Sequence, residues 1–271
     1  MPELPEVETT CRGIEPHISG KVVEKLIVRH QQLRWPIPKD LPALVSNQTV
    51  LSVRRRGKYL LLQFSQGHLL VHLGMSGSLR LVEPTIPPEK HDHVDMVIKN
   101  GMVLRYTDPR RFGAWLWTGE PVEEHKLIRE LGPEPLTTDF SAAHLAKLAI
   151  GRKGPIKTLI MNAHIVVGVG NIYANEALFL AGIHPKRAAG RISSARLGIL
   201  VDKIKEVLQA AIDQGGTTLK DFVGSDGKPG YFKQSLNVYG RAGLPCVECG
   251  DDLREIRLGQ RATVFCKLCQ T

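Results

Sequence analysis

The sequence predicts an α+β protein with two main parts, a β-rich N-terminal part and a helical C-terminal part that ends in a small metal-binding hairpin. Three observations predict this class. The chain has 271 residues, which is close to two domains of ~150 residues. Short apolar runs separated by turn residues fill its first half, and helical patterns replace them from about Glu123. Finally, cysteines in two close pairs stand near the C-terminus.

The first 130 residues are expected to form an antiparallel β-sandwich or barrel with one N-terminal helix. That helix is predicted from Pro5 to about Glu15, because Pro5 suits a first turn and Pro16 and Gly20 mark an end. No helical pattern of ~12 residues separates the β-type runs that follow, so the sheets are expected to be antiparallel. The dipeptide Asn100-Gly101 signals a hairpin. The runs span residues 22–28, 50–54, 59–64, 69–73, 78–82, 94–98, 103–107 and 114–118.

The second half of the chain is predicted to be mainly helical. Residues 194–214 place Leu, Val and Ile side chains on one face, and Gly215 follows directly. The stretch between Gly216 and Gly243 is rich in Gly, Thr, Ser and Lys. It is therefore expected to be a long loop, and loops of such length are usually functional or disordered.

The four C-terminal cysteines predict one structural Zn²⁺ site. They form two CxxC pairs separated by sixteen residues, which is the spacing of a zinc ribbon. Two disulfides are the alternative, but a reducing cytosol disfavours them. A closed site with four thiolate ligands leaves no coordination position open, so the metal is expected to have no catalytic role. The ligands are Cys246, Cys249, Cys266 and Cys269.

Charge and hydropathy limit the partners and the location. Lys and Arg total 36 against 27 Asp and Glu, a formal net charge of +9, which indicates either a polyanionic partner or simply a soluble basic surface. No apolar run approaches the ~18 residues that cross a bilayer. The start MPELPEVE lacks the basic and apolar segments of a secretory signal, so the cytoplasm is the expected location.

The N-terminus carries the most reactive candidate group. Pro2 becomes a secondary amine if Met1 is removed, and its pKa of ~8 leaves more free base at neutral pH than a lysine has. Such an amine can form an iminium with a sugar carbon, although Pro2 could also simply begin the chain. Glu3 and Glu6 could act as a general acid beside it or as partners of the helix dipole. Lys58 follows three arginines and could donate a proton, or the run could be a solvated surface.

Other motifs suggest contacts with phosphates and bases. Two Gly-containing loops carry Met75 and the pair Arg110 and Phe112, which suit a DNA wedge but also ordinary packing. Gly-rich residues before Asn171 could present backbone N–H groups to a phosphate or form only a helix cap.

Together these motifs resemble the bacterial formamidopyrimidine-DNA glycosylases over essentially the whole chain. The resemblance implies two lobes: an N-terminal antiparallel β-sandwich with an N-terminal helix, and a C-terminal lobe with a helix–two-turns–helix motif and a zinc ribbon. The corresponding ranges are 1–130, 131–215, 216–243 for a lesion-capping loop, and 244–271 for the ribbon. The matching motifs are PELPEVE, RRGKYL, HLGMSG, KHDHVD, YTDPRRFGAW, LGPEPL, VVGVGNIYANE, AGIHP, GGTTLKDF, DGKPGYF, VYGR and the cysteine pairs around QRAT.

The resemblance also implies an activity and roles for single residues. The expected enzyme is a bifunctional glycosylase and AP lyase of base excision repair. It excises 8-oxoguanine and formamidopyrimidines from double-stranded DNA, acts as a monomer and needs no membrane. Pro2 resembles the Schiff-base nucleophile, Glu3 the acid, Lys58 the proton donor of β-elimination and Arg261 the residue of δ-elimination. The implied DNA contacts are His72, Met75, His91, Arg110, Phe112, Arg152 and Asn171.

Two departures and two alternatives accompany this hypothesis. Arg152 stands where relatives carry Lys, and Gly154-Pro155 could change the shape of the nearby loop. One alternative is an endonuclease VIII-like enzyme for oxidised pyrimidines. The other is a zinc-ribbon protein that binds DNA without catalysis, and Pro2, Glu3 and Lys58 together argue against it.

Overall fold

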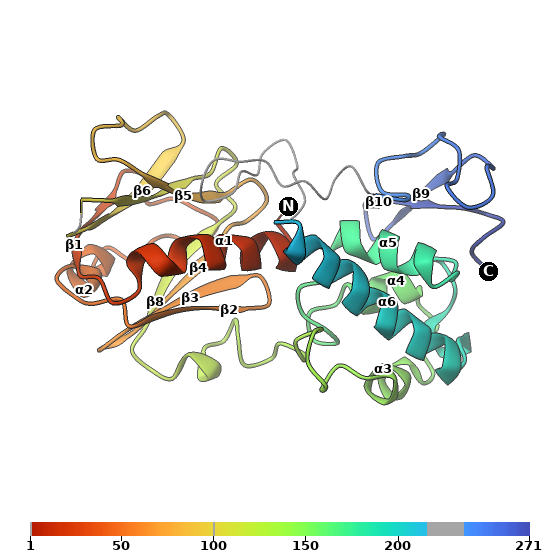
Figure 1. Cartoon of the computed structure of the whole chain (residues 1–271). Coiled ribbons are helices and arrows are strands. Elements are labelled where there is room, and N and C mark those ends of the chain that lie inside the picture. Colours follow the sequence, from red (N-terminus) through yellow and green to blue (C-terminus); the bar gives the residue numbers. More distant parts are fainter. Residues whose placement is uncertain (1, 100, 216–235) are drawn as a thin grey trace. The chain divides into compact units, whose positions relative to one another are not determined.

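The computed structural model describes residues 2–99, 101–215 and 236–271. These residues form two compact units (Figure 1). The first contains the described residues up to Arg129, and the second contains Glu130–Asp213 and residues 236–271. No helix in the described ranges is long and apolar enough to cross a membrane.

Two four-stranded antiparallel sheets form the first unit. One sheet has the order β1-β6-β7-β5, and the other has the order β2-β3-β4-β8. Their facing sides share one apolar core, so the fold is a sandwich and not a closed barrel. A short helix, α2 (Leu41–Val45), packs against β1. The strands are β1 (Val23–Val28), β2 (Ser52–Arg56), β3 (Tyr59–Phe64), β4 (Gly67–His72), β5 (Ser78–Val82), β6 (Asp92–Ile98), β7 (Val103–Thr107) and β8 (Ala114–Thr118).

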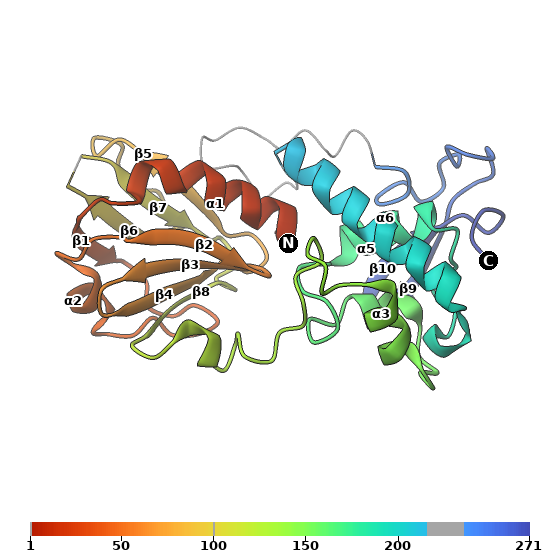
Figure 2. The same cartoon turned by 60° about the horizontal axis from the view of Figure 1, so that its bottom comes forward.

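Helix α1 (Leu4–Ile18) lies against edge strands of both sheets. It contacts β2 and β3 of one sheet and β5 of the other, and Figure 2 shows it running along the sandwich. Its buried residues include Leu4, Ile14 and Ile18. The helix thus covers apolar surface that the sheets would otherwise expose, and it brings the N-terminal end of the chain to the sandwich.

The prediction that Pro16 ends this helix was wrong, because α1 contains Pro16 and continues to Ile18. A proline at this position removes the N–H donor to the carbonyl four residues earlier and crowds that carbonyl, so other interactions must offset its cost. Ile14 and Ile18 on either side of it are completely buried, and this burial stabilises the final turn.

Helices dominate the second unit, as predicted. The long helix α6 (Ser194–Asp213) buries Leu197, Leu200, Ile204 and Leu208 along one face, which packs against α3 (Ala142–Ala149) and α5 (Asn171–Leu180). Helix α4 (Ile156–Ile160) precedes α5. Two single-turn 3-10 helices, η1 (Val122–Glu124) and η2 (Ala189–Arg191), lie in the connections.

A two-stranded hairpin completes this unit, also as expected. Strand β9 (Arg254–Leu258) pairs with β10 (Arg261–Phe265), and β10 packs against α5. The turn between them is Gly259-Gln260, in which both residues have positive φ, 54° and 60°. That conformation matches the twist of the flanking strands.

Candidate functional site

The start of helix α1 holds Pro2 and Glu3 in a buried position. Pro2 is buried and Glu3 is only 2% exposed. The backbone N–H of Glu3 donates to Glu6 Oε2 at 2.8 Å, as part of a capping box at the helix N-terminus. The Glu6 side chain therefore caps the first turn of α1. This bond orients the peptide that joins Pro2 to Glu3.

Lys58 occupies the tip of a tight hairpin. Arg56 pairs with Tyr59, so only Gly57 and Lys58 form the turn between β2 and β3. Gly57 has φ +57°, a conformation that glycine adopts without steric cost. The turn therefore places Lys58 between two strands that both pack against α1.

His72, at the end of β4, is a neutral histidine with a defined tautomer. Its Nδ1 accepts a hydrogen bond from the Gly74 N–H at 3.0 Å, so the proton is on Nε2. Burial, together with the positive charges of Lys58 and Arg34, lowers the pKa of His72 to about 4. The ring also packs on Tyr59, with centroids 4.9 Å apart. An uncharged N–H donor is thus available beside Lys58.

The two loops that carry Met75, Arg110 and Phe112 lie against each other. A Cβ added at Gly74 would stand 2.5 Å from the backbone carbon of Phe112, so only glycine permits this approach. The Arg110 guanidinium lies 5.1 Å above the Phe112 ring. Phe112 is 41% exposed and Met75 is half-buried. The structure therefore brings the three predicted wedge residues to one place.

The side chain of Asp108 connects these two loops by hydrogen bonds, and the sequence did not indicate this role. It is fully buried, and its carboxylate accepts hydrogen bonds from the Ser76 hydroxyl, the Tyr106 hydroxyl and the Gly113 N–H, each at 2.9 Å. Buried carboxylates persist where such donors satisfy them. The only signal in the sequence was an Asp before Pro109, which is also common in ordinary turns.

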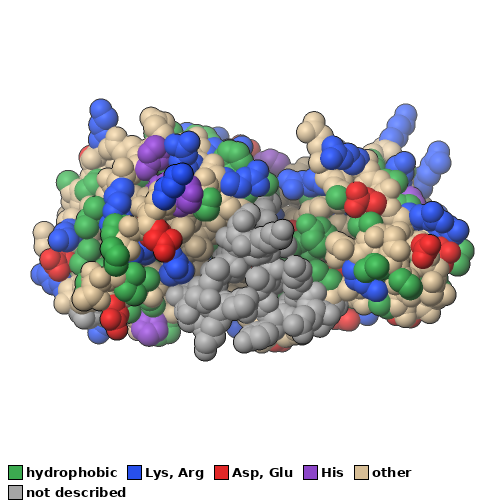
Figure 3. Space-filling view, turned by 90° about the horizontal axis from the view of Figure 1, so that it is seen from above, with side chains coloured by type: hydrophobic (Ala, Val, Ile, Leu, Met, Phe, Trp, Pro, Cys, Tyr) green, Lys and Arg blue, Asp and Glu red, His purple; other side chains and the backbone are tan. Residues whose placement is uncertain are grey.

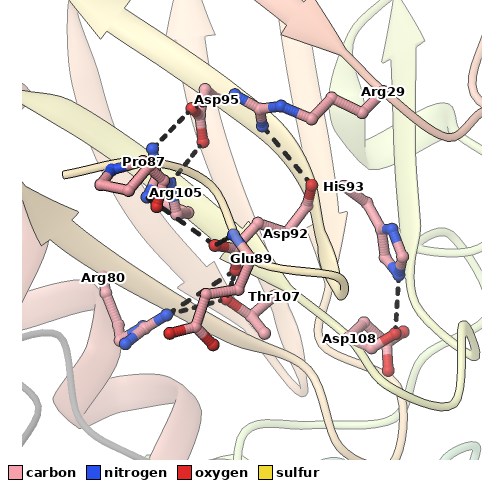
Figure 4. A network of polar contacts seen from close by, with 10 residues as sticks. All are labelled: Arg29, Arg80, Pro87, Glu89, Asp92, His93, Asp95, Arg105, Thr107 and Asp108. Atoms are coloured by element: carbon pink, nitrogen blue, oxygen red, sulfur yellow. Dashed lines mark hydrogen bonds and ion pairs between the residues drawn. The ribbon is translucent and has the colours of Figure 1, made fainter. Parts of the chain in front are cut away.

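A second buried network supports the segment that contains His91. Figure 4 shows Arg29 and Arg105 on the two sides of Asp95. Arg105 donates to Asp95 through Nε at 2.9 Å and Nη2 at 3.0 Å, and its Nη1 donates to the Pro87 carbonyl at 3.1 Å. These bonds hold the chain that leads into β6.

A basic pocket of about 410 Å³ lies beside this network. Its basic lining residues are Arg29, His30, Lys90, His91, His93 and Arg111. Its acidic lining residues are Glu89 and Asp92. His91 is half-buried there. Figure 3 shows Lys, Arg and His side chains together on this unit. Such a surface suits a polyanion.

In the second unit, Lys157 ties Asn171 to the C-terminal hairpin. Lys157 is 1% exposed, and its Nζ donates to Asn171 Oδ1 and Thr263 Oγ1, both at 2.7 Å. Asn171 Nδ2 in turn donates to the Ala262 carbonyl at 3.0 Å. Asn171 and the neighbouring Arg261 are thereby held together. No local sequence pattern indicated this buried role for Lys157.

The remaining candidates of this unit lie at the surface, and Glu176, which the sequence did not single out, anchors a nearby segment. Arg152 and Arg261 are exposed, as phosphate contacts require. Glu176 is 2% exposed and accepts hydrogen bonds from the backbone N–H groups of Asn237, Val238 and Tyr239 at 2.8–2.9 Å. Most of the predicted lesion-capping loop, residues 216–243, lies outside the described residues, and Glu176 bonds to its described part.

The four C-terminal cysteines form a site suited to one structural zinc ion. Their sulfur atoms all lie within 4.8 Å of one another, with 3.9 Å between Cys246 and Cys269 and 3.5 Å between Cys249 and Cys266. A tetrahedron with Zn–S bonds of ~2.3 Å requires S–S distances of ~3.8 Å. The geometry therefore fits zinc, and none of the four is in a disulfide.

Comparison with known proteins identifies the family. Residues 1–115 match the formamidopyrimidine-DNA glycosylase N-terminal domain, residues 131–223 its H2TH domain, and residues 243–271 a zinc finger found in FPG and IleRS. Formamidopyrimidine-DNA glycosylases of Photobacterium profundum and Methylococcus capsulatus are 59% and 60% identical over 270 residues, with 100% of each chain covered.

Solved structures agree with this assignment. The Lactococcus lactis Fpg (MutM) in complex with DNA containing N7-benzyl-Fapy-dG matches with a TM-score of 0.92, 33% identity and 99% coverage of both chains. The MutM (FPG) protein of Thermus thermophilus matches with a TM-score of 0.88, 35% identity, and coverage of 99% of this chain and 98% of that one. On these sequence and structural matches, the chain belongs to the formamidopyrimidine-DNA glycosylase family.

Proposed function

We infer that this protein is a DNA glycosylase of base excision repair that removes oxidised purines, 8-oxoguanine and formamidopyrimidines, from double-stranded DNA. The observation that carries the inference is the buried Pro2 and Glu3 at the start of α1, in a chain that matches formamidopyrimidine-DNA glycosylases over its full length. Solved structures show a mutant of the L. lactis relative with DNA that contains Fapy-dG, and the L. lactis relative with DNA that contains an abasic site. The same substrates suit this chain.

The first chemical step uses Pro2 as a nucleophile. Once Met1 is removed, the secondary amine attacks C1′ of the damaged nucleotide, and the bond from C1′ to the base breaks. The departing base takes up a proton. The amine nitrogen, which is positively charged once it has bonded to C1′, gives up its own proton, so the two transfers balance. Glu3 then gives a proton to the ring oxygen O4′ as the C1′–O4′ bond opens, so that a cationic iminium remains between Pro2 and C1′.

The iminium makes strand cleavage possible. It acidifies the C2′ proton, and loss of that proton expels the 3′ phosphate by β-elimination; a second, δ-elimination expels the 5′ phosphate. Lys58 supplies the proton transfers of the first elimination, and Arg261 assists the second while it binds phosphate. Zinc holds the hairpin that carries Arg261 and does not enter the reaction.

The remaining candidates bind and distort the DNA. The target carbon is inaccessible in a stacked duplex, so the nucleotide must be flipped out at a cost of a few kcal/mol. Met75, Arg110 and Phe112 fill the space that it leaves. The neutral Nε2–H of His72, together with His91, Arg152 and Asn171, binds backbone phosphates.

We also propose how the chain is divided by role and where the protein acts. The boundaries 1–130, 131–215, 216–243 and 244–271 divide the chain by role, and most of the third range lies outside the described residues. The protein acts as a monomer in the cytoplasm, on chromosomal DNA, because its substrate is there.

The decisive experiment is borohydride trapping on a duplex with one 8-oxoguanine, followed by mass mapping of the crosslinked peptide. An adduct on the peptide that begins at Pro2 is expected, because borohydride reduces the iminium. Pro2→Gly and Glu3→Gln should cripple base release, with circular dichroism unchanged.

Two results would contradict the proposal. A mobility shift with an intact strand and no adduct, from protein lacking Met1, would support a zinc-ribbon protein that only binds DNA. Faster release from a duplex with an oxidised pyrimidine than from one with 8-oxoguanine would favour the endonuclease VIII-like alternative.

A further inference from the structure

One partly buried ion pair connects helix α1 to the strand that leads into the Lys58 turn. Glu8 lies on α1 and Arg55 lies on β2, and Arg55 Nε donates to Glu8 Oε2 at 2.7 Å. The two side chains are only 11% and 19% exposed. A charged hydrogen bond with such geometry and burial orients its partners far better than an exposed ion pair does.

The guanidinium of Arg55 also forms a hydrogen bond with the hairpin turn. Arg55 Nη1 donates to the Gly57 carbonyl at 3.1 Å. This carbonyl belongs to the peptide bond that joins Gly57 to Lys58, and Gly57 and Lys58 are the whole turn. The Arg55 side chain thus links the Gly57–Lys58 peptide bond to helix α1, which begins two residues after Pro2.

Glu8 is charged when it holds Arg55. Burial raises the pKa of Glu8, but the hydrogen bonds and charges of Arg55 and Arg12 outweigh burial, so its pKa lies below the usual value. Arg12 provides an internal comparison. Its Nε bonds the other carboxylate oxygen, Oε1, also at 2.7 Å, yet its side chain is 60% exposed. The bond of Arg12 is to a residue of its own helix.

We propose that Arg55, held by Glu8, is a positioning residue that sets the location of Lys58 relative to the Pro2 nitrogen. The proposal rests on the functions proposed above for Pro2 and Lys58. It assigns no chemistry to Arg55. Proton transfer depends steeply on the placement of the donor, and an error of about 1 Å can cost roughly a hundredfold in rate. Strand scission, which uses Lys58, should therefore suffer more than base release.

The test compares two single-turnover rates in the full-length, zinc-loaded protein. One is strand scission of a duplex with a preformed abasic site, and the other is base release from a duplex with 8-oxoguanine. Arg55→Gln and Glu8→Gln should slow scission by about tenfold or more while base release changes by less than about threefold. Arg12→Gln, the matched control, should leave both rates within about twofold, because it removes a bond to Glu8 that does not reach the turn.

Two more variants show whether the pair acts as a unit. The double variant Glu8→Gln/Arg55→Gln should be no slower in scission than Arg55→Gln alone, since both changes break one connection. Arg55→Lys keeps the charge but lacks the fork that bonds Glu8 and Gly57 together, so it should remain defective.

Opposite results would overturn the proposal. Unchanged scission in Arg55→Gln, or an equal loss in Arg12→Gln, would show that the pair does not position Lys58. Equal slowing of both reactions with a lower Tm would indicate a merely structural role. Lys58→Gln separates the two levels: if it slows scission and Arg55→Gln does not, only the positioning role fails. If Lys58→Gln itself has no effect, the proposed function of Lys58 fails and the positioning role with it.

Discussion

The surroundings of His72 set both its charge and the ring nitrogen from which it can donate. The Gly74 N–H occupies Nδ1, and burial with nearby cations lowers the pKa to about 4. At neutral pH the ring is therefore uncharged and can donate only from Nε2. Next to Lys58, a neutral donor can bind a phosphate oxygen without adding a second positive charge.

The lowered pKa of His72 predicts a pH dependence of stability. The unfolded histidine takes up a proton near pH ~6.5, whereas the folded one does so only near a pKa of about 4. Between these values the unfolded state binds more protons, so stability is lost as pH falls through this window. Urea unfolding of wild type and His72→Asn at several pH values checks this. The difference in their free energies of unfolding should shrink from pH 7 to pH 4.5, and a constant difference would contradict the assignment.

Single residues also show which parts of the site can be predicted from the sequence and which cannot. The spacing of the cysteines by itself predicts a metal site. Pro2 and Lys58 were only candidates by their own chemistry, and the roles expected of them came from the resemblance to the family. Asp108 and Lys157 could not be predicted, because their partners Ser76 and Thr263 are distant in the chain. An isolated Asp or Lys has no local pattern that distinguishes a buried, bonded group from a solvated one.

At the scale of elements, local patterns were enough for most of the fold. Strands β3, β5, β7 and β8 have the predicted bounds, because Gly and polar turn residues border each apolar run. The end of α1 was misplaced because the burial of Ile14 and Ile18, a tertiary effect, outweighs the preference of Pro16. Which strands become neighbours, as in β1-β6-β7-β5, depends on long-range pairing that no local window contains.

The C-terminal hairpin is the element that depends most on its metal. Between the cysteine pairs it buries little beyond Leu253, Val264 and Phe265, so metal binding must supply much of its folding free energy. Lys157 and Asn171 then attach the ordered strand to α4 and α5. Arg261 has a fixed position only while this hairpin is folded.

Removal of zinc should therefore weaken DNA binding more than it affects the rest of the fold. Chelation or Cys249→Ser is expected to lower affinity for damaged duplex by at least about tenfold, since one hydrogen bond to a charged group contributes ~1.5–3 kcal/mol. Titration by fluorescence anisotropy, with zinc content measured on the same samples, checks this. Cys11→Ser, which changes a buried cysteine of the other unit, is the control. Unchanged affinity in zinc-free protein would rule out the role of the hairpin.

The whole molecule is basic, and the cationic side chains among its candidate DNA-contacting residues are spread over both units. Lys58 and Arg110 belong to the first unit, and Arg152 and Arg261 belong to the second. Four thiolates and one Zn²⁺ add −4 and +2, so the formal charge of +9 becomes about +7 in the zinc-loaded protein. Affinity for DNA should then depend mainly on the release of counterions from phosphates.

This charge distribution predicts a steep response of DNA affinity to salt. Each neutralised phosphate contributes about −0.9 to the slope of log K against log salt concentration, so four cations give a slope of about −3.6 or steeper. Arg152→Gln should reduce the magnitude of the slope by about 0.9, equally for damaged and undamaged duplexes, because a phosphate contact carries no base specificity. Lys203→Gln is the matched control, since Lys203 pairs with Glu206 on α6 at 2.7 Å, and it should leave the slope unchanged.

Anisotropy titrations between 50 and 300 mM KCl, a range of about sixfold chosen to resolve one unit of slope, measure both effects. An unaltered slope in Arg152→Gln would remove Arg152 from the interface, and a flat response in the wild type would contradict the phosphate contacts as a group.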